Sequence, residues 1–131
     1  MAFLQRDAPG EVRAVLRTRP WLRGVRVTNR TSATADDIHN GPYVSVVGDG
    51  TPTAGRATAT ENVRINVFSK WEPEDRDLAA RIDAYLLDPS TPLGFVVRPG
   101  AQLLVIPDEQ TKGYVAAVTV RAAGTKNGVN L

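Results

Sequence analysis

The sequence contains no cysteine and only one histidine among its 131 residues. Without cysteine, disulfide bonds and cysteine-ligated zinc sites are excluded, so the fold has to rest on packing alone. Apolar runs are short. The longest, such as 103–106 and 114–118, fall well below the roughly 20 residues that a membrane-spanning helix needs. The first seven residues contain no apolar stretch typical of a secretory signal. We therefore expect a protein that neither crosses nor binds a membrane.

The composition is that of an ordinary globular protein, with 42% hydrophobic and 23% charged residues. A chain of this length suits one domain and buries about two-thirds of its extended surface on folding. We expect a single domain over residues 9–121, preceded by an N-terminal arm at 1–8. Residues 122–131 are small, polar and rich in glycine, so they are expected to form a flexible C-terminal tail.

Two segments carry helix signals. Asp7 is a capping residue and Pro9 suits a first turn, and the apolar residues that follow share one face until Arg19-Pro20 ends the helix. A second helix is predicted from Pro73 to Asp88, with acidic residues in its first turn, where the helix dipole favours negative charge. Its predicted core stripe is formed by Leu78, Ile82, Tyr85 and Leu86.

Period-two alternation indicates a strand over residues 61–69, with Val63, Ile65 and Val67 on one face. The small-residue segment 51–60 is either a mobile loop or the tip of a long hairpin. Further strands are predicted at 25–28, 42–47 and 95–97, and a hairpin at 102–106 and 114–121. Together these elements predict an α+β fold: an antiparallel or mixed sheet of four to six strands with two helices packed on one face.

The sequence offers little for catalysis. Asp36, Asp37 and His39 could ligate a metal or transfer protons, but no further ligand cluster accompanies them, and Asn40-Gly41 is typical of a turn. We favour a structural role for these residues, with a small enzyme as the alternative. The segment 50–57 copies the glycine spacing of a phosphate-binding loop but lacks its lysine and hydroxyl, and no helix follows it. No cofactor and no metal are expected.

Charge is distributed unevenly along the chain. Residues 1–30 contain seven arginines against two acids, whereas acids dominate residues 72–88. Both stretches could simply be solvated helix faces, or the first helix could bind nucleic acid. Alternatively, they could attract each other between copies of the chain. The candidate interface residues are then Arg13, Arg17 and Arg23 on the basic side and Glu74, Asp75 and Asp77 on the acidic side.

The arrangement of these elements resembles that of a known family. An arginine-rich first helix is followed by the strand Pro42-Tyr43-Val44-Ser45-Val46-Val47-Gly48, and then by Glu61-Asn62-Val63-Arg64-Ile65-Asn66-Val67-Phe68-Ser69. A helix at 79–87 and a closing hairpin complete the pattern. Over roughly residues 8–122, the chain resembles the tail terminator (minor tail) proteins of long-tailed bacteriophages.

The resemblance implies a structural role without catalytic residues. Such proteins form a ring, expected to be hexameric, which caps the tail tube, stops its polymerisation and joins it to the head connector. The implied partners are further copies of the chain, the tail tube protein and a head–tail connector or stopper protein, with DNA only passing through the lumen. The implied location is the neck of the virion, and the host cytoplasm during assembly. Another neck protein, a head–tail stopper or closure protein, is the alternative.

A closed ring needs two different patches that meet on neighbouring subunits, which the basic and acidic residues above could supply. The loops at 31–41 and 51–60 have few apolar anchors, so we expect them to become ordered on docking to the tube or connector. The candidate docking residues are Asp36, Asp37, His39, Thr51, Thr53, Arg56 and Thr58.

Overall fold

Two long antiparallel strands form the centre of the computed structural model, which describes residues 1–101 and 103–131, with the backbone alone of Thr53. Strands β5 (Thr58–Ser69) and β8 (Tyr114–Thr125) pair without interruption along their whole lengths. Because side chains alternate along a strand, this register places the buried valines and isoleucine of β5 on the same face as Val118 and Val120 of β8. This face is called the helix face below.

The remaining strands extend this pair on both sides. The sheet has seven strands, of which five follow one another in the order β2-β3-β5-β8-β6, while β4 pairs with β5 and β7 with β8. Among the strand pairs of the described residues, β2–β3 is parallel and the others are antiparallel, so the prediction of an α+β fold with a mixed sheet is confirmed. The remaining strands are β2 (Arg26–Thr28), β3 (Tyr43–Gly48), β4 (Thr53–Ala54), β6 (Val96–Pro99) and β7 (Leu104–Pro107).

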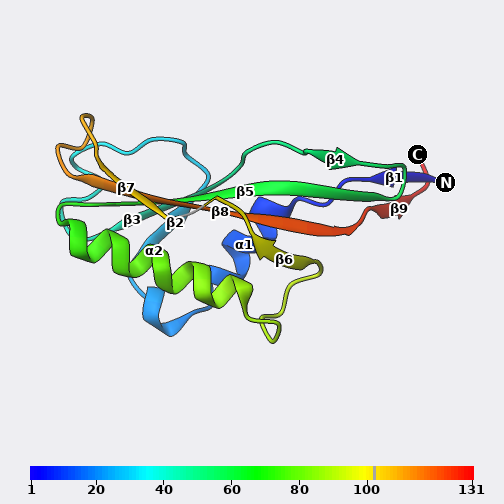
Figure 1. Cartoon of the computed structure of the whole chain (residues 1–131), viewed down its shortest axis with the longest axis horizontal. Helices are drawn as coiled ribbons and strands as arrows, with labels where there is room; N and C mark the ends of the chain where they lie inside the picture. Colours follow the sequence, from blue (N-terminus) through cyan, green and yellow to red (C-terminus); the bar gives the residue numbers. More distant parts are fainter. Residues whose placement is uncertain (102) are drawn as a thin grey trace.

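Both helices cover the helix face, as predicted (Figure 1). Helix α1 (Ala8–Arg17) begins after Asp7, whose carboxylate accepts a hydrogen bond from the Gly10 amide at 3.1 Å. A short 3-10 turn (Pro20–Leu22) follows it. Helix α2 (Glu72–Leu87) lies against β8 and β5. The core between helices and sheet includes the fully buried side chains Val12, Leu16, Val46, Val63, Ile65, Ile82 and Leu86.

The opposite face of the sheet is covered only at one end. There the loop 29–42 places Ala33 and Ile38 over Tyr43 and Phe68 and forms a second, smaller core. Val115 packs against the edge of this cluster. Among residues 1–101 and 103–131, no helix lies on the rest of this surface, which is called the open face below (Figure 1).

The two ends of the chain pair with each other in an arm that projects from the body (Figure 1). Strand β1 (Ala2–Leu4) is antiparallel to β9 (Asn127–Val129), and residues 122–125 are the last part of β8. The structure thus differs from the prediction of a flexible tail over 122–131. That prediction rested on the lack of large side chains, whereas strand pairing uses backbone groups that every residue except proline supplies in full.

Small residues in the arm also have a packing role. A Cβ atom added at Gly124 would lie 2.9 Å from the Cβ of Phe95, so the close approach of the two chain segments requires glycine there.

Within the described residues, no helix is both long and apolar enough to cross a membrane.

The core predicts a clear difference between two leucine truncations. Leu16 is fully buried between α1 and the sheet, so Leu16→Ala should lower the free energy of unfolding by about 2–5 kcal/mol. Leu4 is exposed on the arm, and Leu4→Ala should change it by less than about 0.5 kcal/mol. Denaturant unfolding followed by circular dichroism measures both. Equal effects would show that Leu16 is not part of the main core.

Candidate assembly surfaces

The predicted basic patch is largely used inside the protein. Arg13 Nη1 donates to the carbonyl oxygen of Val46 at 2.6 Å. Val46 lies on β3, just beyond the residues of β3 that pair with β2. Arg17 donates from Nη2 at 2.6 Å and from Nε at 3.2 Å to the carbonyl oxygen of Val27 on β2. These two arginines tie α1 to the sheet edge, so of the three predicted basic residues only Arg23 lies exposed without such a role.

The predicted acidic patch divides in a similar way. Glu74 and Asp77 are exposed, and Asp77 forms an ion pair with Arg81 at 3.5 Å. Asp75, however, is fully buried against the sheet, and neither of its carboxylate oxygens has a hydrogen-bond partner within the described residues. Burial raises the pKa of Asp75 from 3.8 to about 6, and the nearby charges of Glu72 and Glu74 add to this effect. Asp75 therefore does not belong to a surface patch, which corrects the sequence prediction.

The burial of Asp75 makes stability depend on pH. A carboxyl whose pKa is raised in the folded state binds protons more tightly there, so unfolding becomes easier as pH rises from about 4 to about 6. Asp75→Asn removes the buried charge and should stabilise the protein by about 1–3 kcal/mol at pH 7, with the gain disappearing near pH 4. Denaturant unfolding at several pH values measures this, and Asp77→Asn serves as the exposed control. An Asp75→Asn variant that is less stable at every pH would contradict this assignment.

The possible catalytic cluster is not assembled. Asp37 accepts hydrogen bonds from Arg26 at 2.7 Å and Arg30 at 3.2 Å, and also from the amide and hydroxyl of Thr34. These contacts, with the Thr34 backbone amide first, lower the pKa of Asp37 from 3.8 to about 2. Asp36 and His39 lie exposed on the same loop. Within the described residues, no group of three or more metal-ligating side chains is found.

The contacts of Asp37 also explain why the loop at 31–41 is better anchored than the sequence suggested. Both arginines that bind Asp37 stack over the ring of Tyr43, with Arg26 at 4.8 Å and Arg30 at 5.6 Å from the ring centroid. Ile38 is buried beneath the loop. The prediction that this loop has few anchors is therefore wrong. A single apolar residue in a polar segment shows no periodicity, so the sequence pattern did not reveal that Ile38 is buried.

A test of this anchoring compares two neighbouring residues. Asp37→Ala should remove the ion pairs and speed amide hydrogen exchange across residues 29–42. His39→Ala should leave exchange there unchanged, because the described contacts of His39 are made by its backbone: the amide donates to the carbonyl oxygen of Asp36 at 3.3 Å, and the carbonyl accepts from Lys70 Nζ at 3.0 Å. Hydrogen exchange measured by mass spectrometry reports both. Similar exchange in the two variants would contradict a role for Asp37 in fixing the loop.

The second predicted docking segment, 51–60, forms part of the arm. The alternative of a long hairpin tip is confirmed, because Thr53 and Ala54 pair with Thr60 and Ala59. Thr58 pairs with Thr125, and the hydroxyl of Thr51 accepts from Gln5 at 3.0 Å. The guanidinium of Arg56 lies 4.8 Å from the ring centroid of Phe3 on β1.

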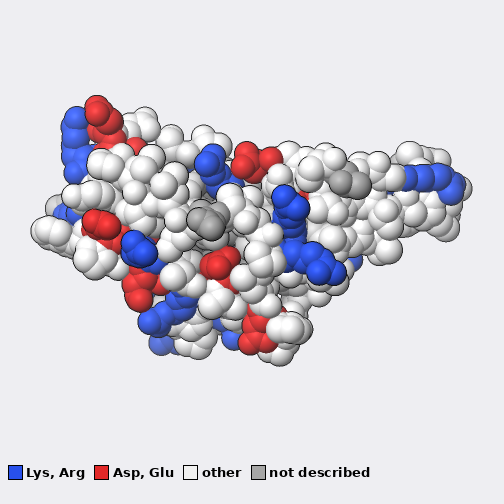
Figure 2. Space-filling model, viewed as in Figure 1, with Lys and Arg blue, Asp and Glu red and all other residues white. Residues whose placement is uncertain are grey.

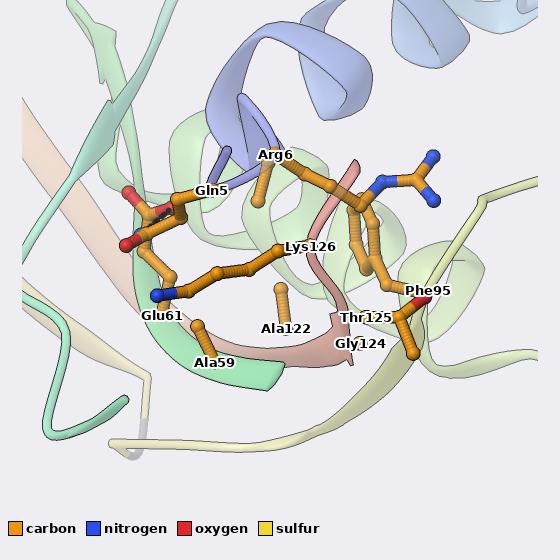
Figure 3. A pocket seen from close by; sticks show the side chains of 10 residues that line it. Gln5, Arg6, Ala59, Glu61, Phe95, Ala122, Gly124, Thr125 and Lys126 are labelled. Carbon is orange, nitrogen blue, oxygen red and sulfur yellow. Dashed lines mark hydrogen bonds between the residues drawn. The ribbon is translucent and has the colours of Figure 1, made fainter. Parts of the chain in front are cut away.

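A small hollow lies where the arm joins the body (Figure 3). Gln5, Glu61 and Lys126 line one side and Arg6 and Phe95 the other. Gln5 donates to Glu61 at 3.2 Å. Its volume is about 20 Å³, which holds roughly one water molecule. This hollow is therefore a packing feature and too small for an organic ligand.

The open face is a surface that the sequence did not indicate. In the register of the sheet, Arg98 of β6 lies opposite Arg121 of β8, and Arg64 of β5 lies diagonally beside Arg121. Exposed aliphatic side chains of β6 and β7 share this face. Only the pairing register shows these neighbours, since the three arginines are far apart in the sequence. Figure 2 shows basic side chains gathered near β6, and charges of both signs mixed over α2.

Comparison with known proteins supports the fold. No family model matches the sequence, and a search of the curated proteins finds no match either. Among solved structures, the chain is similar to one described as "Virion of native gene transfer agent (GTA) particle". The match has a TM-score of 0.65 and 16% sequence identity, and covers 92% of this chain and 95% of that one. At this identity, the likeness shows a shared fold.

Proposed function

We propose that this chain is a structural protein of a phage-like virion and acts as a tail terminator. Copies of it form a ring, expected to have six members, at the end of the tail tube, where they stop tube polymerisation and connect the tail to the head. The observation that carries the proposal is the fold match to a chain from a gene transfer agent virion, because it covers nearly the full length of both chains. A match of this extent compares whole domains rather than a common local motif.

The surfaces of the protein support action through assembly. The possible catalytic carboxylate, Asp37, is bound by two arginines. In contrast, the chain has a projecting arm and a sheet face without a covering helix (Figure 1). Both are features through which subunits can bind one another, while neither arranges groups for a reaction.

The proposed role in ending tube growth makes a specific prediction about particles. When the gene is deleted from its genome of origin, tail tubes should grow beyond their normal length and remain separate from heads. Electron microscopy of negatively stained lysates measures tail length and attachment. Supplying the wild-type chain from a plasmid should restore joined tails of uniform length.

Two other results would identify a different role. Tails of normal length beside unattached heads would indicate the alternative neck role of a stopper or closure protein. Normal, infectious particles would show that the chain is not required for virion assembly and would contradict the proposal.

A further inference from the structure

The open face carries a row of like charges that the protein itself does not neutralise. Arg98 and Arg121 are directly opposite on neighbouring strands, and Arg64 is the diagonal neighbour of Arg121. Like charges in such positions repel each other and destabilise an isolated sheet. Within the described residues, none of the three forms an ion pair, and all three are exposed. We call Arg64, Arg98 and Arg121 the basic band.

Aliphatic side chains lie on the same face as the basic band. Val96, Leu104 and Ile106 are 56%, 57% and 46% exposed, and their register partners on β8 share the face of Arg121. Nucleic acid would be held through its phosphates and would leave these aliphatic groups uncovered. Arginines beside exposed aliphatic side chains are more typical of a protein–protein interface. The open face therefore fits a protein partner with acidic and apolar groups.

The start of α2 has these complementary properties. Trp71 is 67% exposed directly before the helix, and Glu72 and Glu74 are exposed in its first turn. The backbone of Trp71 is held in place, because its amide donates to Ser69 Oγ at 3.2 Å and its carbonyl accepts from the same hydroxyl at 2.7 Å. Tryptophan is among the residues that most often dominate the binding energy of interfaces. We call Trp71, Glu72 and Glu74 the α2 corner.

We propose that the basic band and its aliphatic neighbours bind the α2 corner of a second copy of this chain. Helix α2 covers the helix face, whereas the basic band lies on the open face. Two different surfaces therefore meet in each contact, and a repeated contact of this kind closes into a ring when its rotation permits. The inference rests on the ring of the proposed function and names the surfaces that join its subunits. It replaces the sequence-based pairing of Arg13, Arg17 and Arg23 with Glu74, Asp75 and Asp77, and of these six residues it keeps Glu74 alone.

Charge reversal tests the contact. The wild-type chain should self-associate as its concentration rises, as measured by sedimentation equilibrium. Arg121→Glu should weaken this association at least about tenfold, because it places like charges against Glu72 and Glu74. It should also raise the Tm of the monomer, because the new glutamate lies opposite Arg98. Arg23→Glu changes the net charge equally at another exposed site and should leave association unchanged.

A charge swap makes the test specific. Arg98→Glu/Arg121→Glu and Glu72→Lys/Glu74→Lys should each associate poorly alone, while an equal mixture of the two should form mixed assemblies. A wild-type chain that stays monomeric at about 1 mM, where even contacts worth about 4 kcal/mol are populated, would overturn the inference. So would an Arg121→Glu variant that associates normally. If Arg121→Glu instead loses salt-dependent binding to duplex DNA and keeps its self-association, the band is a DNA-binding surface.

These outcomes are separate from those of the gene deletion. Overlong tails in the deletion strain together with normal association of Arg121→Glu would leave the terminator role standing and reject this interface. Normal particles in the deletion strain together with a successful charge swap would keep the interface and reject the terminator role.

Discussion

The uninterrupted pairing of β5 with β8 is the constraint on which the other parts of the structure depend. Its register decides which side chains face the helices, and so it places the main core on one side and the basic band on the other. A shift of one residue would exchange the two faces and expose Val63, Ile65 and Val67 to water. The same two strands continue beyond the body and form the framework of the arm. The core, the open face and the arm therefore all follow from the pairing of β5 with β8.

The sequence contained enough information for the fold class and for most elements. The alternation over 61–69 correctly identified the face that is buried, and Asp7 and Pro9 marked the start of α1 because capping is a local interaction. The ends of the chain were harder to predict. Their pairing joins residues more than a hundred positions apart, and their side chains are too small to show a hydrophobic pattern. Backbone pairing of that kind leaves little trace in composition.

The candidate surfaces were harder to predict for a related reason. Clustering of arginines along the chain suggested a patch, but Arg13 and Arg17 are used to satisfy carbonyl groups at the sheet edge. Asp75 lies in an acidic run and yet faces the core, because three neighbouring positions of a helix point in different directions. The arginines that do form a row come from three separate strands. Their proximity depends on strand order and register, which single-sequence periodicity does not reveal.

The β1–β9 pairing also has a practical meaning for how the molecule can be handled. Because the first and last residues meet at the tip of the arm, a peptide or fluorescent protein fused to either end would be displayed at the same place, away from both helices and from the basic band. Adjacent termini also permit circular permutation, in which a short linker joins the old ends and new ends open elsewhere. The tip of the arm is thus a single attachment point for labels on every subunit of an assembly.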